Sequence, residues 1–307
     1  MENKKPRADY WDNVKGLLIL LVVYGHLIEQ LPGGKNSAVY KLIYLFHMPL
    51  FVFCSGYLSR FSPEKILKRL LLPYVLLQAV CCIITVQEIQ MTTPYWALWY
   101  LPALAVWRIT IPFLESCSQK AAPLVIAAAL LCACLFGFDN TVGYYGTLSR
   151  MIVFYPYFIA GYYARKYGYH PRTPKQAGRV FPALVLLSAV GIFLFFSSYF
   201  EADWLYEAYS YRGGNYNIFF RAAHYFMAAA IGSSILFLMP KKRTIFTAWG
   251  YNSFPIYLTH IAITPAVQMI FSFRRTGRLF SYTACALLSA VYCTAVARKK
   301  VSGKASG

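Results

Sequence analysis

Residues 12–31 read DNVKGLLILLVVYGHLIEQL and place one histidine, His26, deep inside a strongly apolar run. An ionisable ring within a membrane segment is costly, so it is a functional-site hypothesis by default. A purely structural helix bundle has little reason to repeat this placement, yet the chain does repeat it. Four of the five histidines lie in apolar segments and the fifth lies in a polar loop: His26, His47, His224 and His260, against His170. The sequence therefore predicts a polytopic membrane enzyme.

The composition is not that of a soluble protein with a water-facing surface. Of the 307 residues, 58% are hydrophobic and 13% are charged, whereas soluble domains carry roughly a quarter charged residues. The net charge is +19, from 30 Lys and Arg against 11 Asp and Glu. In a soluble protein this excess would indicate nucleic acid. Here the basic residues lie mostly in short loops between apolar runs, so we expect the lipid bilayer as the partner and no nucleic acid.

The metal-binding and disulfide patterns are missing from the sequence. Most of the eight cysteines lie in apolar runs and none belongs to a C-x-x-C pair, which favours small buried side chains over a zinc site or a disulfide framework. We therefore expect no metal. The first apolar run lacks a small-residue cleavage site and carries His26 and Glu29, so we expect it to be a helix of the mature protein.

Runs of about 20 apolar residues predict membrane-spanning helices, because barrel strands would alternate over about 10 residues. We expect an all-α bundle of about ten transmembrane helices that forms one domain over 1–307, with tails at 1–13 and 298–307. The ten predicted spans are 14–31, 38–58, 68–89, 95–113, 122–138, 150–166, 180–200, 216–239, 248–271 and 279–297.

The loop charges predict the orientation. Basic residues gather in alternate connectors, which include the triplets Arg172, Lys175, Arg179 and Lys241, Lys242, Arg243. By the positive-inside rule these connectors and both termini are cytoplasmic. One group departs from this alternation, because Arg274, Arg275 and Arg278 would then lie outside. Either that outer loop is tolerated or the last two spans are misjudged.

Lys15 and His26 point from the same face of the first predicted helix. The eleven positions from Lys15 to His26 correspond to three helical turns plus about 20° of rotation and to a rise of about 16 Å. Lys15 is therefore expected at the cytoplasmic edge and His26 near mid-membrane. A cation there can hold an anionic cosubstrate, with Asp12 orienting it. Glu29, three residues after His26, can fix the imidazole tautomer. The alternatives are a snorkelling anchor for Lys15 and an interhelical hydrogen bond for His26.

The second predicted span carries His47 two residues before Pro49. The proline permits a kink beside the histidine. Counted from opposite ends of two antiparallel helices, His47 and His26 come to a similar depth, so we expect the two imidazoles to lie together. A helix-packing role is the alternative for His47. Ser55 and Gly56 are expected to allow close helix approach.

These motifs carry a family resemblance. The pattern D-N-x-K-G followed by His26, together with F-H-M-P-L-F-x-F-x-S-G-Y over residues 46–57, resembles acyltransferase family 3 and, more narrowly, its fucose 4-O-acetylase-like branch. Weaker pieces agree in order along nearly the whole chain: RLLLPY at 69–74, WYL at 99–101, FIAGYY at 158–163 and IYLTH at 256–260.

The resemblance implies a bacterial enzyme of the cytoplasmic membrane that moves an acetyl group from acetyl-CoA to a carbohydrate of surface polysaccharides or related acceptors. It implies that His26 is the general base for the acceptor hydroxyl or the group that relays the acyl, assisted by His47 and Glu29. The candidates for binding the coenzyme A phosphates are Lys15, which Asp12 would orient, and the pair Lys68 and Arg69. For Lys68 and Arg69 the alternative is that they anchor a loop. The family often has arginine at the position of Lys15, and lysine lacks the planar guanidinium fork.

Other intramembrane cations are candidates for the acceptor path. They are Arg150, Arg221, His224 and His260. Pairing with the acidic residues Glu201, Asp203 or Glu207 is the alternative for Arg150, Arg221 and His224, and a structural role is the alternative for His260. We expect the protein to lack the extracytoplasmic hydrolase-like domain of some family members, in which case it either completes transfer itself or passes the acyl group to a separate partner protein.

Two other classes of protein fit part of this pattern. A transporter or flippase of polysaccharide or lipid-linked sugar would also use buried His and Arg with proline-broken helices. The alignment of Lys15 with His26 favours the enzyme, whereas inverted repeats, which are not visible, would favour the transporter. A membrane sensor without turnover is a third possibility, and the clustered histidines disfavour it.

Overall fold

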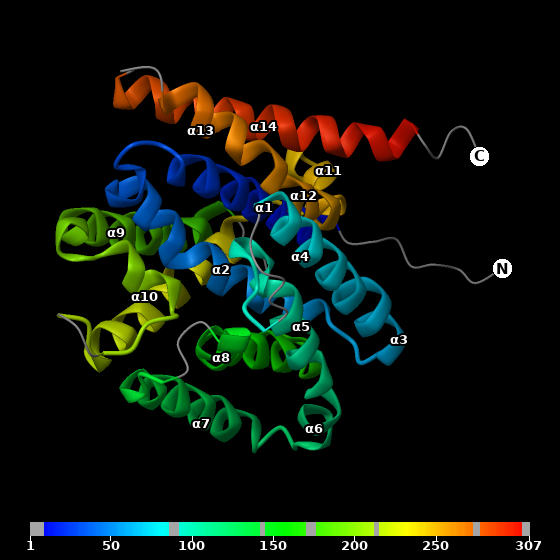
Figure 1. Ribbon diagram of the computed structural model, residues 1–307. Helices are drawn as coiled ribbons and strands as arrows, with labels where there is room; N and C mark the ends of the chain where they lie inside the picture. Colours follow the sequence, from blue (N-terminus) through cyan, green and yellow to red (C-terminus); the bar gives the residue numbers. More distant parts are fainter. Residues whose placement is uncertain are drawn as a thin grey trace. The chain divides into compact units, whose positions relative to one another are not determined.

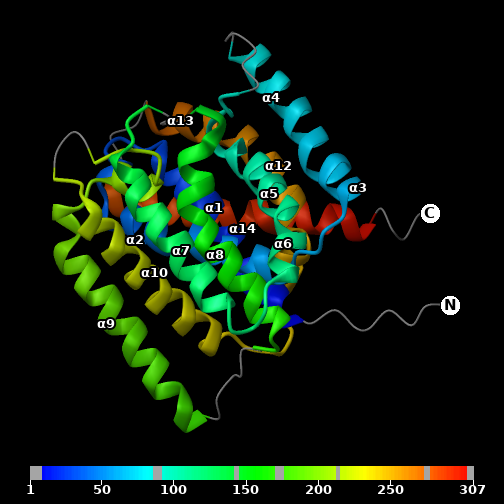
Figure 2. The same ribbon diagram turned by 90° about the horizontal axis from the view of Figure 1, so that it is seen from below.

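The structure is a computed structural model that describes residues 9–85, 92–141, 145–169, 176–211, 215–272 and 277–302. Throughout these residues the chain is helical or irregular, without strands, which confirms the all-α prediction (Figures 1 and 2). Several predicted features lie outside the described residues: His170, Arg172, Lys175, Arg274, Arg275, the tail residues 1–8 and 303–307, and residues 86–89 of the third predicted span.

The chain divides into two compact units. The first comprises residues 1–51, 171–202 and 227–307, and the second comprises residues 52–170 and 203–226. Two long helices, α2 (Ala38–Leu58) and α10 (Ile218–Leu238), contribute residues to both units. The prediction of a single domain over residues 1–307 stays a prediction.

The remaining α-helices fall within one unit each. The first unit has α1 (Asp9–Glu29), α9 (Val180–Phe196), α11 (Ile245–Tyr251), α12 (Ser253–Thr259), α13 (Thr264–Ser272) and α14 (Arg278–Ser302). The second unit has α3 (Pro63–Ile66), α4 (Leu72–Ile84), α5 (Tyr100–Ile109), α6 (Ile111–Ser116), α7 (Ala122–Leu135) and α8 (Leu148–Lys166).

Short helical turns complete the elements. The turn η2 (Leu67–Leu71) is π-helical and joins α3 to α4. The 3₁₀ turns are η1 (Gly34–Asn36), η3 (Trp96–Trp99), η4 (Phe136–Phe138), η5 (Tyr145–Thr147), η6 (Gln176–Arg179), η7 (Ser197–Tyr199), η8 (Ala202–Tyr206) and η9 (His260–Ile263).

Eight helical segments of the described residues are long and apolar enough to cross a membrane, which makes this a multi-pass membrane protein. They overlap eight of the ten predicted spans. The other two predicted spans are also helical, but α7 with η4 forms a shorter apolar helix, and α8 includes the charged residues Arg150, Arg165 and Lys166.

The ninth predicted span, 248–271, is not one continuous helix. The chain forms α11, α12, η9 and α13 in succession, and Ser253–Phe271 is the part long and apolar enough to span. Proline accounts for two of the three boundaries between these elements. Pro255 lies in the first turn of α12 and Pro265 in the first turn of α13, where the missing N–H costs nothing, whereas a continuous helix would require both N–H groups.

In the first unit, α1 packs against α11, α12 and α14. Figure 1 shows the blue α1 beside the red α14. The contact with α11 is made by backbone. A Cβ added to Gly16 would lie 1.9 Å from the carbonyl oxygen of Phe246, and one added to Gly250 would lie 1.7 Å from that of Asp12. Only glycine permits this approach.

The second unit repeats this device where α8 meets residues 52–58 of α2. A Cβ on Gly56 would lie 2.0 Å from the carbonyl oxygen of Phe158, and one on Gly161 would lie 2.0 Å from that of Phe53. The expectation that Gly56 permits close helix approach is confirmed. Next to α8 lie α5 and α7.

Candidate active site

His26 and Glu29 form a hydrogen-bonded pair in the last two turns of α1. The Nδ1 atom of His26 lies 3.2 Å from Oε2 of Glu29, as their spacing of three positions allows. The side chains are 12% and 11% exposed, so both are largely removed from water. The expectation that Glu29 contacts the His26 ring is confirmed.

Tyr44 of α2 joins this pair. Its hydroxyl lies 3.1 Å from Nδ1 of His26 and 3.4 Å from Oε2 of Glu29. The sequence argument did not single out Tyr44 as a site residue. A signal was present, because Tyr44 lies three positions before His47 and so shares its face of the helix.

A tight turn brings a lysine to the same carboxylate. Gly33 adopts a left-handed conformation with φ 70°, and a Cβ on Gly34 would lie 1.9 Å from the carbonyl oxygen of Ile28. The turn that these glycines permit places Nζ of Lys35 3.1 Å from Oε1 of Glu29. Glu29 thus has a cation at one oxygen and the His26 ring at the other. Lys35 was also missed from sequence, where it was an ordinary loop residue.

His260 and His47 lie beside the pair and are both buried. The His260 ring stacks on the His26 ring, with centroids 5.2 Å apart. His47 contacts the ring of Tyr44 edge-on at 4.9 Å. The ring N–H groups of His47 and His260 are donated within their own helical segments, to Ile43 O at 2.7 Å and to Tyr257 O at 2.6 Å. His47 is therefore connected to His26 through Tyr44.

This arrangement can perform general base chemistry. When Nδ1–H of His26 donates to the Glu29 carboxylate, the lone pair is on Nε2, and the carboxylate stabilises the imidazolium that forms after proton uptake. All five side chains of this cluster belong to the first unit: His26, Glu29, Tyr44, His47 and His260.

Asp12 and Lys15 lie at the other end of α1, where α11 is docked. Nζ of Lys15 is 2.7 Å from Oδ1 of Asp12 and donates to the carbonyl of Gly250 at 3.1 Å. The expected Asp12–Lys15 pairing is therefore present. The same contacts give both residues a part in helix packing, and their expected role in donor binding remains a prediction.

Asn13, between them in the motif, is fully buried and was missed by the sequence argument. Its Nδ2 donates to the carbonyls of Pro240 and Lys242 at 2.9 and 2.8 Å. Its Oδ1 accepts from the hydroxyls of Thr244 and Thr247 at 2.8 and 2.6 Å. The amide makes all four of its possible hydrogen bonds. It holds the turn before α11 against α1.

Lys68 and Arg69 belong to the second unit, whereas Asp12 and Lys15 belong to the first. Both lie in η2 and are exposed. Nζ of Lys68 is 3.0 Å from Oε1 of Glu64, in an exposed pair four positions apart. Such pairs contribute little to stability. Their expected role in phosphate binding is still a prediction.

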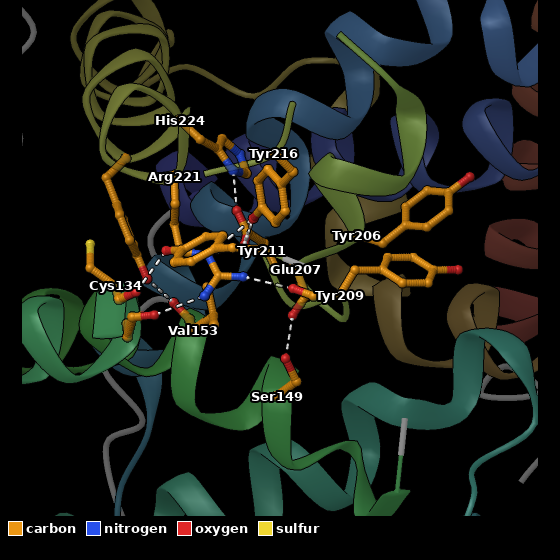
Figure 3. A network of polar contacts seen from close by, with 12 residues as sticks. Cys134, Ser149, Val153, Tyr206, Glu207, Tyr209, Tyr211, Tyr216, Arg221 and His224 are labelled. Atoms are coloured by element: carbon orange, nitrogen blue, oxygen red, sulfur yellow. Dashed lines mark hydrogen bonds and ion pairs between the residues drawn. The ribbon is translucent and has the colours of Figure 1, made fainter. Parts of the chain in front are cut away.

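Arg221 and His224 meet Glu207 in a buried cluster of the second unit (Figure 3). The side chains of Arg221 and Glu207 are 0% and 2% exposed, and Arg221 Nε lies 3.1 Å from Oε2 of Glu207. Nδ1 of His224 bonds the other carboxylate oxygen. Arg221 and His224 therefore both pair with Glu207, which was the alternative to an acceptor contact.

The Arg221 guanidinium makes further contacts, as Figure 3 shows. It donates to the Tyr216 hydroxyl at 3.0 Å and to the carbonyls of Ala133 and Tyr209 at 2.9 and 3.1 Å. It also lies 4.8 Å from the centroid of the Tyr211 ring. These bonds connect α10 to α7 and to the segment that precedes α10. The cluster therefore fixes that segment.

The environment of Glu207 keeps it ionised. Burial by itself would raise the pKa of the Glu207 carboxyl, but His224, Arg221 and the Tyr216 hydroxyl together hold this pKa below its ordinary value. Burial raises the pKa of the neighbouring Tyr211 to about 12, so this phenol is neutral at physiological pH.

Arg150 also contacts the segment before α10. Its Nε donates to the carbonyl of Tyr206 at 3.0 Å, and its guanidinium lies 5.1 Å from the centroid of the Trp99 ring. The expected acceptor contact of Arg150 is untested. Among the described residues no group of three His, Cys, Asp or Glu side chains is placed to hold a metal ion, and the expectation of no metal stays a prediction.

Comparisons with known proteins place the chain in a family. A family model described as an acyltransferase domain matches residues 8–298. A protein of Sinorhizobium fredii named Nodulation protein NolL is 53% identical over 55 residues, which is 16% of this chain and 15% of that protein. The protein of the same name from Mesorhizobium japonicum is 48% identical over 54 residues, 16% and 14% of the two chains. The matched segment is a small part of each relative. No solved structure matches.

Proposed function

The chain belongs to acyltransferase family 3, and from this membership we propose that it moves an acetyl group from acetyl-CoA to a carbohydrate hydroxyl, with His26 as the group that accepts the hydroxyl proton. It is a multi-pass membrane acyltransferase. The acyl donor, the carbohydrate acceptor, the location in a bacterial cytoplasmic membrane and a separate extracytoplasmic partner protein are parts of the proposal.

One observation carries the catalytic part of the proposal: Nδ1 of His26 lies 3.2 Å from Oε2 of Glu29. A carbohydrate hydroxyl is a poor nucleophile at neutral pH, and a positioned base accelerates its attack by about 10² to 10⁴. With Nδ1–H donated to Glu29, the basic Nε2 lone pair can accept the proton. Lys35 and Tyr44 hold the carboxylate in place.

The proposed reaction balances without a metal or a redox partner. As the hydroxyl oxygen bonds to the acetyl carbonyl carbon, its proton passes to Nε2 of His26. The carbon–sulfur bond then breaks, and the proton returns from His26 to the leaving thiolate to give free coenzyme A. In the alternative route His26 carries the acetyl group itself and then releases it to the hydroxyl.

Of the residues that the sequence suggested for acceptor binding, Arg221 and His224 are not proposed for this role. His260 stacks on His26, so a contact with the bound acceptor is consistent with its position. Arg221 and His224 are engaged with Glu207, which supports a role in fixing the segment before α10.

The proposal is tested with purified protein, labelled acetyl-CoA and a panel of carbohydrate acceptors. Wild type is compared with His26→Ala and His26→Gln, and release of free coenzyme A and labelled product are both measured. We expect loss of about 10²-fold or more in both variants. Ser289→Ala, a buried polar substitution in α14, is the matched control and should behave like wild type.

Three results would separate the possibilities. Acid-quenched single turnovers that leave label on wild-type protein but not on His26→Ala would establish the relay route. Equal product formation by His26→Ala and wild type would refute the assignment of His26. Movement of label across the vesicle membrane without acetylated product would refute the enzyme proposal and support a transporter.

A further inference from the structure

A basic turn precedes α11 and consists of Lys241, Lys242 and Arg243. All three side chains are exposed. No ion pair between them and an acidic side chain occurs in the described part of the chain, whereas Lys15 is paired with Asp12 at 2.7 Å. The basic turn therefore adds three exposed positive charges at this end of α1.

The backbone of the basic turn is held in place. Asn13 Nδ2 binds the carbonyls of Pro240 and Lys242, and this asparagine is fully buried. The residue that follows the turn, Thr244, begins α11 with a capping box shared with Thr247. A fixed backbone lowers the entropy that three side chains lose when they close on one ligand.

The basic turn and the candidate active site lie along the same helix of the same unit. Asn13 and His26 are thirteen positions apart in α1, a rise of about 20 Å. In coenzyme A, thirteen bonds join the nearer phosphorus atom to the sulfur. A fully extended peptide with the same number of backbone bonds spans roughly 16 Å. Phosphates at the basic turn would thus leave the thioester close to the level of His26.

We propose that the basic turn binds the phosphate groups of the acyl-CoA donor, and that the D-N-x-K-G motif serves this binding by fixing the turn to α1. This inference rests on the proposed function. Phosphate esters are the chemistry that the turn recognises, and an anionic lipid headgroup would present the same chemistry from another source.

The test compares wild type with the triple variant K241A/K242A/R243A in a neutral detergent without anionic lipid. Two donors are used: acetyl-CoA, and S-acetylpantetheine, which lacks phosphates. We expect the ratio of kcat/KM for acetyl-CoA to that for S-acetylpantetheine to fall about tenfold, as for the loss of three exposed charge contacts. The affinity for free coenzyme A, measured by calorimetry, should fall by a similar factor.

The matched control R60A/K65A/K120A removes three exposed basic residues that are predicted to lie on the same membrane side. This variant should leave the donor ratio within twofold of wild type. An equal fall in both triple variants would mean that only overall charge matters and would overturn the proposal. Thermal unfolding of each variant identifies misfolding, and K241R/K242R/R243K, which keeps the charges, should retain the ratio.

The remaining outcomes distinguish the sources of phosphate and the two proposals. If coenzyme A affinity is unchanged in the K241A/K242A/R243A variant, while wild type alone binds vesicles rich in phosphatidylglycerol, the turn serves lipid and the inference is wrong. If coenzyme A binds wild type through the turn but no acetyl transfer occurs, the proposed function fails while the phosphate site stands.

Discussion

The His260 ring stacks on the His26 ring, with centroids 5.2 Å apart and planes inclined by 25°. His260 begins η9, between the proline-started helices α12 and α13. Its own ring N–H is donated to the carbonyl of Tyr257, which fixes the orientation of the ring. The break in the ninth span therefore places a rigid plane against the candidate base.

Removal of this plane should loosen His26. We expect His260→Ala to reduce kcat by about 10- to 100-fold, because small displacements of a catalytic group are costly. His260→Phe keeps an aromatic ring and should retain most activity. The measurement is steady-state kinetics with each variant. Equal loss in the alanine and phenylalanine variants would instead indicate that the His260 imidazole itself contacts substrate.

Glu29 should matter through the imidazole and not through substrate binding. In Glu29→Gln the carboxylate that stabilises the protonated His26 is gone, and we expect kcat to fall by about 10²-fold or more with little change in the KM for acetyl-CoA. Glu29→Asp keeps the charge and should lose less. A rise in KM with unchanged kcat would contradict this role.

Tyr44 should contribute a smaller part. Tyr44→Phe removes one hydroxyl that contacts both His26 and Glu29, and we expect about a tenfold loss in kcat, the size of one hydrogen bond to a charged group. Tyr282→Phe, in α14 of the same unit, is the control and should keep wild-type kcat. Unchanged activity of Tyr44→Phe would show that Glu29 alone fixes the ring.

The sequence was sufficient for the helical class and for the pairing of His26 with Glu29, because both follow from local spacing. Hydropathy located all ten helical regions, although α8 is less apolar than a span. Tyr44, Lys35 and Asn13 were missed because their contacts depend on how separate helices and turns meet. Asn13 binds residues more than 220 positions away, and no local pattern specifies such partners.

The contact between α1 and α11 should be sensitive to one methyl group. In Gly16→Ala the new Cβ would lie 1.9 Å from the Phe246 carbonyl oxygen, so the two backbones must separate, and we expect a loss of about 1–3 kcal/mol in stability. The measurement is thermal unfolding in detergent. Gly191→Ala, in α9 with nothing within 4 Å of its Cβ, should be neutral or stabilising. A neutral Gly16→Ala would disprove the close approach.

The Glu207 cluster should make the stability of the fold decrease at acidic pH. Because the folded pKa of Glu207 lies below its ordinary value of 4.5, the ionised carboxyl stabilises the fold above that value, and this contribution is lost as the pH falls through the folded pKa. We expect Glu207→Gln to be less stable than wild type at pH 7 by about 3–5 kcal/mol, and so to unfold at a lower temperature, since Arg221 loses its buried counter-charge.

The pH series separates this cause from a general packing defect. The difference in unfolding temperature between wild type and Glu207→Gln should stay constant from pH 7 down to about 5 and then shrink below the ordinary carboxyl pKa. Glu201→Gln, an exposed substitution nearby in sequence, should follow wild type throughout. A difference that persists unchanged at the lowest pH would mean that the shape of Glu207, and not its charge, holds the segment before α10.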